Sequence, residues 1–66
     1  MRLTINGDFF ETSGTRTLEE LLNELDIEPG RVAVEVNLSI VKKADYPAFM
    51  LNEGDKIEIV NFVGGG

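Results

Sequence analysis

Hydrophobic and polar residues alternate near the start of the chain, which is the pattern of a strand with one buried face. Leu3 and Ile5 are each flanked by polar residues. The pair Asn6-Gly7 follows directly, and Asn-Gly between apolar segments is the strongest short-range signal for a hairpin turn. The sequence therefore predicts a β-hairpin whose returning strand spans residues 9–12.

Leucines at helical spacing mark the next element. They occupy positions i, i+3, i+4 and i+7, which form one apolar stripe of an amphipathic helix. The stripe consists of Leu18, Leu21, Leu22 and Leu25. Thr17, with Glu20 three residues later, fits a capping box and predicts the helix start. We expect Pro29-Gly30 to end this helix, because proline cannot continue the hydrogen-bond pattern.

Period-two alternation returns in the second half of the chain. Valines at every second position predict a strand over residues 32–36, and Ile40-Val41 is expected to add a short edge strand. A turn at residues 53–55 precedes a final strand over residues 56–63. Three strands are thus expected after the helix.

The segment from Lys42 to Asn52 lacks clean periodicity. It contains Pro47, which argues against regular strand pairing. We expect Phe49 and Leu51 to fill part of the core from an irregular crossing.

The order of these elements predicts an α+β roll. In it, one main helix lies across one face of a mixed sheet of four to five strands, and the last strand pairs beside the first. The expected core packs Leu21, Leu22 and Leu25 against Leu3, Ile5, Val34 and Ile57. Residues 1–63 form the expected domain and residues 64–66 a flexible tail.

The last predicted strand has apolar residues on both faces. Ile57 and Ile59 share one face, whereas Val60 and Phe62 fall on the other. One interpretation is a bulge or rim contact that returns Phe62 to the core. The other is an exposed apolar patch of Val60, Phe62 and Val63 that binds a partner protein beside the tail. The sequence leaves both interpretations open.

Composition narrows the chemistry that the chain can perform. A chain of 66 residues is enough for one small domain, which removes only roughly 60% of its unfolded surface from water. It has no cysteine and no histidine, so we expect no disulfide, no metal site and no catalytic residue of its own. The net charge of −6 disfavours nucleic acid and anionic membranes and favours a basic protein surface as partner. No apolar leader or membrane span is evident, so cytoplasmic residence is expected.

Three glycines, Gly64, Gly65 and Gly66, close the sequence. Glycine ranges freely over φ and ψ and has no side chain, so such a tail is thin enough to enter a narrow slot. Residues 63–66, fully extended, reach at most about 13 to 14 Å. In an arbitrary protein, terminal glycines more often form a frayed end or a cloning remnant.

The ordered set of segments resembles the ThiS family, which is similar to the molybdopterin-synthase subunit MoaD and to ubiquitin in having the β-grasp fold. The resemblance covers essentially the whole chain and includes its ending Phe62-Val63-Gly64-Gly65-Gly66, in which Gly65-Gly66 is the terminal pair that the family shares. Its other segments are Met1-Arg2-Leu3-Thr4-Ile5-Asn6-Gly7, Thr17-Leu18-Glu19-Glu20-Leu21-Leu22, Val34-Glu35-Val36-Asn37 and Gly54-Asp55-Lys56-Ile57-Glu58-Ile59.

The resemblance implies a sulfur carrier in the thiazole branch of thiamine biosynthesis. An E1-like adenylyltransferase of the ThiF type would adenylate Gly66 with ATP and magnesium. Sulfur from a donor such as a cysteine desulfurase would then give a thiocarboxylate for a thiazole synthase of the ThiG type. Gly64 and Gly65 would thread into the partner's active site, and the chain would be a co-substrate that binds no cofactor.

Three alternatives remain open at this stage. A MoaD-like carrier would supply sulfur to molybdopterin, tungstopterin or tRNA thiolation. A non-catalytic interaction module would bind through its sheet while the tail stays idle. A ubiquitin-like modifier would use the same adenylation to form an amide with a lysine.

Overall fold

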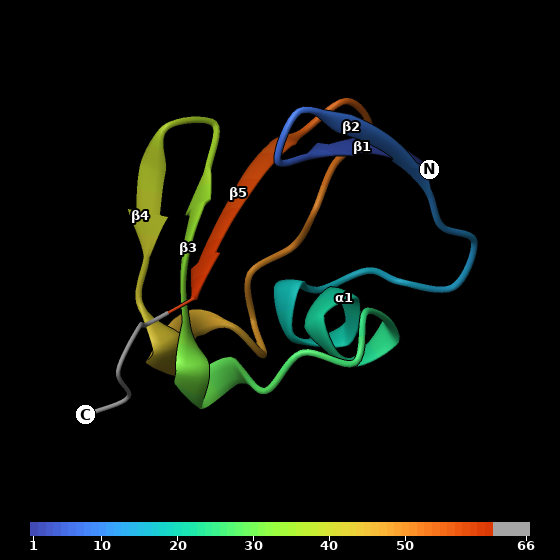
Figure 1. Ribbon diagram of the computed structural model, residues 1–66. Coiled ribbons are helices and arrows are strands. Elements are labelled where there is room, and N and C mark those ends of the chain that lie inside the picture. The colour runs from blue at the N-terminus through green and yellow to red at the C-terminus, as the bar shows by residue number, and fades with distance from the viewer. Residues whose placement is uncertain (62–66) are drawn as a thin grey trace.

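The computed structural model describes residues 1–61, which form one five-stranded sheet and one α-helix (Figure 1). The strands are β1 (Arg2–Ile5), β2 (Asp8–Glu11), β3 (Val32–Val36), β4 (Ser39–Val41) and β5 (Lys56–Asn61), and the helix is α1 (Leu18–Glu24). Two short 3₁₀ turns span Pro29–Arg31 and Lys43–Asp45. Within the described residues, no helix is long and apolar enough to cross a membrane.

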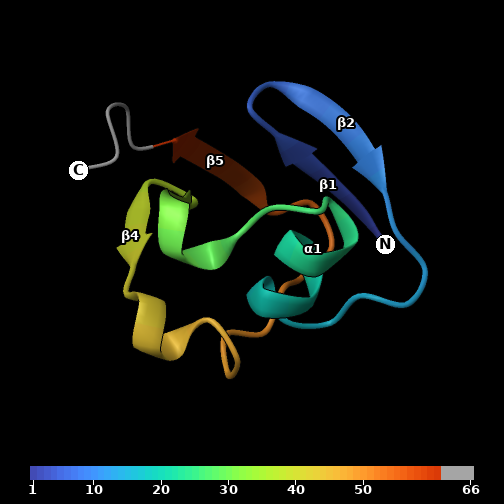
Figure 2. The ribbon, with the colours of Figure 1, turned by 60° about the horizontal axis from the view of Figure 1, so that its bottom comes forward.

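The sheet has the strand order β2-β1-β5-β3-β4, so that β5 lies at its centre. β5 runs parallel to β1 and antiparallel to β3, with Ile5 opposite Ile57 and Val34 opposite Ile59. The predicted mixed sheet, with the last strand beside the first, is therefore confirmed. α1 lies on one side of the curved sheet in both views (Figures 1 and 2).

α1 begins as predicted but ends earlier than predicted. The capping box is present, because Thr17 accepts from the Glu20 amide while the Glu20 carboxylate accepts from the Thr17 amide. At the other end, Asp26 adopts a left-handed φ of 60°, and its N–H donates to the Asn23 carbonyl. The Ile27 N–H reaches back to the Leu22 carbonyl, which completes a Schellman motif. The prediction that Pro29-Gly30 ends the helix was wrong, because this motif ends it first.

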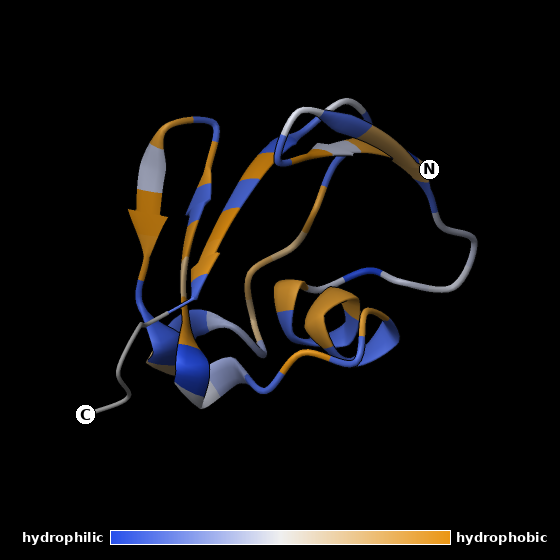
Figure 3. Cartoon of the chain, viewed as in Figure 1, coloured by the Kyte–Doolittle hydropathy of each residue, from blue (hydrophilic) through white to orange (hydrophobic). Residues whose placement is uncertain are grey.

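The core lies between α1 and the sheet. Its buried apolar residues are Leu3, Leu18, Leu21, Leu22, Val32, Val34, Val36, Val41, Tyr46, Leu51 and Ile57. Of the predicted core residues, Ile5, Leu25 and Phe49 are only partly buried and pack at its margin. Figure 3 shows the corresponding alternation of hydrophobic and hydrophilic residues along the strands.

Tyr46 is a core residue that the sequence pattern did not reveal. The 3₁₀ turn Lys43–Asp45 directs it inward, and only 2% of its surface remains exposed. Burial raises the pKa of its phenol, although a backbone hydrogen bond with Val34 acts in the opposite direction. The crossing is otherwise irregular, as expected, and Leu51 is buried.

Candidate functional site

β5 is the strand that leads to the predicted tail. Phe62, Val63, Gly64, Gly65 and Gly66 lie outside the described residues, as does the predicted boundary between the domain (1–63) and the tail (64–66). The site therefore consists, in the structure, of β5 and the groups that hold it in place.

Asn6 fixes the carboxyl half of β5 from one side. β1 ends at Ile5, and the Asn6 side chain continues its ladder by bonding both backbone groups of Ile59. The amide Nδ2 donates to the Ile59 carbonyl over 3.1 Å, and Oδ1 accepts from the Ile59 N–H over 2.7 Å. Asn6 has a left-handed φ of 49°, a backbone conformation that asparagine and aspartate adopt more readily than most other residues.

Asn37 fixes the start of β5 from the other side. Its Oδ1 accepts from the Lys56 N–H, and its Nδ2 donates to the Asp55 carboxylate over 2.9 Å. Asp55 is buried and also accepts from the Asn52 N–H. Two turn asparagines thus hold β5 at both ends, and Asp55 has a structural role here.

The β3–β5 register runs without interruption from Val36 opposite Ile57 to Val32 opposite Asn61. There is no bulge in this part of β5, so Val60 points away from α1. Val60 is 61% exposed and lies opposite exposed Ala33. Val60 is therefore exposed and outside the core, whereas its role in partner binding and the positions of Phe62 and Val63 stay predictions.

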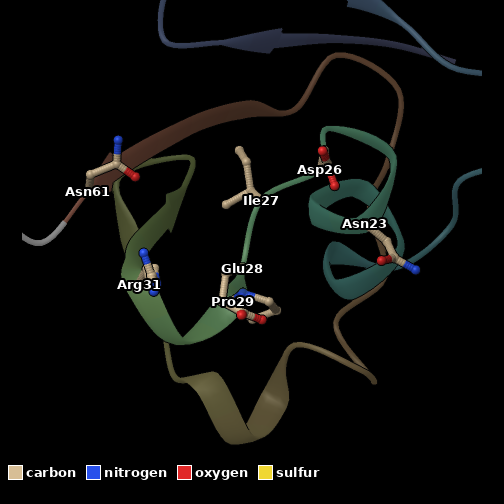
Figure 4. Close-up of a pocket in the computed structure, with 7 residues that line it drawn as sticks. All are labelled: Asn23, Asp26, Ile27, Glu28, Pro29, Arg31 and Asn61. Carbon is tan, nitrogen blue, oxygen red and sulfur yellow. The ribbon is translucent and has the colours of Figure 1, made fainter.

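A hollow lies beside the end of β5, between the end of α1 and the following loop (Figure 4). It is lined by Asn23, Asp26, Ile27, Glu28, Pro29, Arg31 and Asn61. Most of these side chains are polar, unlike the apolar lining typical of small-molecule sites. Among residues 1–61, no three acidic side chains gather in a way that would hold a metal ion.

Two carboxyl groups of α1, those of Glu20 and Glu24, have lowered pKa values. Backbone hydrogen bonds from Arg16 and Thr17 lower the pKa of Glu20. Hydrogen bonds from the hydroxyls of Thr15 and Thr12 lower the pKa of Glu24. Both groups stabilise the fold around α1, so they do not point to acid-base chemistry.

Replacing Asn6 with alanine is expected to destabilise the domain by about 1 to 3 kcal/mol, because two hydrogen bonds to β5 are lost. Chemical denaturation measures this change. Hydrogen exchange should accelerate at the Ile59 amide more than at the Val34 amide, which stays paired within the sheet. Asn6→Asp keeps the acceptor for the Ile59 N–H but places a second carboxylate oxygen against the Ile59 carbonyl, so it should also be less stable than the wild type. An alanine variant as stable as the wild type would show that the Asn6 side chain does not hold β5.

Three comparisons with known proteins bear on this site. The model of the ThiS family matches residues 3–66. The chain is 42% identical to the sulfur carrier protein ThiS of Bacillus subtilis, over 97% of this chain and 98% of that one. It is also similar to a ThiS thiamine biosynthesis protein from Geobacter metallireducens, whose crystal structure superimposes with a TM-score of 0.85 at 32% identity and full coverage of both chains. The predicted β-grasp fold is thereby confirmed.

Longer relatives contain the same kind of segment. The chain is 50% identical, over its whole length, to part of a thiazole synthase from Paramagnetospirillum magneticum. It spans 20% of the length of that relative, and the same share of a thiazole synthase from Magnetococcus marinus.

Proposed function

Because this chain belongs to the ThiS family, we propose that it is a sulfur carrier for thiamine thiazole biosynthesis, with the Gly66 carboxylate as its working group. The observation that carries the proposal is the extent of the family match, which continues through the terminal glycines to residue 66. The similarity to ThiS of Bacillus subtilis over nearly the full length of both chains supports it. In this role the chain is a co-substrate of other enzymes.

The proposed chemistry follows from the properties of a carboxylate. An α-carboxyl group has a pKa of about 3.3 to 3.7, so near neutral pH it is ionised and a poor electrophile. A ThiF-type adenylyltransferase would use ATP and Mg²⁺ to make the acyl-adenylate at Gly66. Sulfide would displace AMP and leave a thiocarboxylate directly. A persulfide from a cysteine desulfurase would instead displace AMP to give an acyl disulfide, which a thiol would then reduce to the thiocarboxylate. Dependence on ATP is the reason for placing this step in the cytoplasm.

The composition agrees with this division of labour. The chain has no cysteine or histidine, so the nucleophile, the metal and the ATP site are assigned to the partners. A thiazole synthase of the ThiG type is the proposed sulfur acceptor. The thiazole synthases that contain a similar segment support this choice.

Val60 contributes to the proposed partner interface. It is exposed on the face of β5 that α1 does not cover, one residue before the end of the described strand. Phe62 and Val63 are proposed to extend this interface toward the tail. Gly64 and Gly65 would supply the narrow backbone that enters the active site.

Intact mass spectrometry tests the proposal directly. The purified chain is incubated with ATP, Mg²⁺, a sulfur donor and the ThiF-type enzyme of the same organism. We expect a mass gain equal to the replacement of one oxygen by one sulfur. A reaction without ATP is the control and should leave the mass unchanged. If the mass does not change while the same enzyme activates a known ThiS carrier, the proposed function is wrong. An amide-linked product would instead identify a protein modifier.

A further inference from the structure

The turn between β3 and β4 contains a leucine, Leu38, that has a left-handed backbone conformation and is exposed to solvent. Both properties are unfavourable for a large apolar residue. Val36 pairs with Ser39, so Asn37 and Leu38 form a two-residue turn, with φ values of 51° and 73°. Glycine is the usual residue at the second position of such a turn, because a side chain is strained at positive φ. Leu38 is nevertheless found there, and 88% of its surface is exposed.

The structure around Leu38 holds this strained turn rigidly. Asn37 is bonded through its side chain to Asp55 and Lys56, and its own N–H donates to the Lys56 carbonyl over 2.7 Å. Asp55 is buried, so this anchor is part of the folded core region. Strained residues that the surrounding structure holds in place tend to occur at functional sites. Leu38 is thus an apolar group presented on a fixed support.

The sheet face beside Leu38, which α1 does not cover, combines an exposed apolar residue with two glutamates. Ile40 is 76% exposed on β4 and lies opposite Glu35, which in turn lies opposite Glu58 on β5. Two carboxylates directly opposite each other repel, and like-charged cross-strand pairs are destabilising. Within residues 1–61, neither Glu35 nor Glu58 has a side-chain hydrogen bond or an ion pair. We call Glu35, Leu38, Ile40 and Glu58 the hairpin surface.

The opposite half of the same sheet face does not share these features. Phe9 is also exposed, but the Arg2 guanidinium lies 4.9 Å from the centre of its ring. Arg2 also forms an ion pair with Glu11 on the neighbouring strand. On the β1–β2 half, a cation thus lies against the apolar and acidic groups. At the hairpin surface, Lys56 precedes Glu58 by two residues on the same face of β5 but forms no ion pair with either glutamate within residues 1–61. The tip of the β3–β4 hairpin lies away from α1, and part of it is hydrophobic (Figures 1 and 3).

We propose that the hairpin surface docks onto the thiazole synthase, at a site where an apolar hollow is bordered by arginine or lysine side chains. This inference rests on the proposed function. The unpaired carboxylates would be neutralised by basic side chains of the partner. Leu38 and Ile40 would be buried against an apolar part of the same partner surface. The partner is chosen because the longer relatives carry a similar segment within a thiazole synthase chain.

One partner is able to cover both this surface and the tail. β5 rises by about 3.3 Å per residue, so its two ends are roughly 17 Å apart. A standard interface buries about 800 Å² on each partner, which is wide enough to extend along the whole strand. The hairpin surface would then set the position of the carrier while the tail enters the active site.

Leu38→Gly is the main test, because a docking role and a structural role predict opposite results. Glycine relieves the left-handed strain, so the melting temperature should rise by about 4 to 8 °C. The affinity for the purified thiazole synthase of the same organism, measured by calorimetry, should fall about tenfold because a buried leucine contact is lost. Met50→Ala removes another exposed apolar side chain, beside the start of α1, and should leave the affinity unchanged.

A second variant tests the charges. Glu35→Gln with Glu58→Gln keeps the side-chain size and removes the repulsion, so the fold should not lose stability. Its affinity for thiazole synthase should be lower than that of the wild type and should depend less on salt. Wild-type affinity in both variants would overturn the proposal.

Thiocarboxylate formation by the adenylyltransferase separates this inference from the proposed function. Leu38→Gly should be converted at the wild-type rate, because the hairpin surface is assigned to the other partner. If conversion fails for the wild type, the proposed function is wrong. If Leu38→Gly slows conversion and leaves binding to thiazole synthase intact, the hairpin surface serves the adenylyltransferase and the inference is wrong.

Discussion

Removal of Gly65 and Gly66 is expected to abolish thiocarboxylate formation while the thermal unfolding of the domain stays the same. The apolar core of the described residues ends with Ile57, so the shortened chain keeps every one of these contacts. The new carboxylate, on Gly64, would be displaced by up to about 7 Å. Because the reacting carbon must meet the attacking atom within a narrow distance, a shift of this size removes the reaction altogether.

A second deletion distinguishes the effect of tail length from the requirement for a terminal Gly-Gly pair. Deleting Gly64 alone shortens the tail by at most about 3.6 Å but keeps a terminal Gly-Gly pair. We expect this variant to retain measurable conversion, since the proposed requirement is the terminal pair and Gly64 adds reach. Circular dichroism melts of all three chains check the fold. A chain lacking Gly65 and Gly66 that is still converted would refute the role assigned to the tail.

Local patterns predicted the elements of this fold because each pattern reflects interactions within a few residues. The stripe of leucines and the capping pair Thr17 and Glu20 define the start of α1 without reference to the rest of the chain. Alternation likewise predicted β3 and the inward face of β5. The end of α1 was misplaced because Asp26 occupies a left-handed position where glycine is the usual signal.

Features that depend on the neighbours in space were not predictable in this way. Tyr46 becomes a core residue only because a 3₁₀ turn in an aperiodic segment directs it inward. Asn6-Gly7 was correctly interpreted as a turn, but the bonds from Asn6 to Ile59 require β5 to lie beside a strand that ends at Ile5. Leu38 gave no sequence signal either, because only the backbone shows that it lies at positive φ.

Within the candidate site, the exposure of Val60 on β5 was likewise not predictable from the local sequence pattern. The parity of Val60 was evident in the sequence, but its exposure depends on whether another element covers that face. In the structure α1 packs on the opposite face, so the question raised by the pattern is answered for Val60. The assignment of Gly66 rests on the family match, because the described residues end five positions earlier.

Leu21→Ala is expected to lower the stability of the domain strongly. Leu21 lies on α1 with no exposed surface, in the middle of the apolar stripe that packs against the sheet. Replacing a buried leucine with alanine costs about 2 to 5 kcal/mol, through lost burial and the cavity that remains. A domain of this size buries only roughly 60% of its unfolded surface, so its total stability is expected to be small. The loss should leave the variant substantially unfolded at physiological temperature.

Leu38→Ala is a matched control, because it makes the same chemical change at a position that is 88% exposed. It should alter the free energy of unfolding by less than about 0.5 kcal/mol. Urea denaturation of both variants measures the difference, and similar values would show that α1 does not pack against the sheet as described. Leu21→Ala also tests whether the tail alone is sufficient for recognition or whether the folded domain is required. The variant keeps Gly66 but loses the ordered β5, so a loss of thiocarboxylate formation would show that partner enzymes recognise the folded domain, not the glycine tail alone.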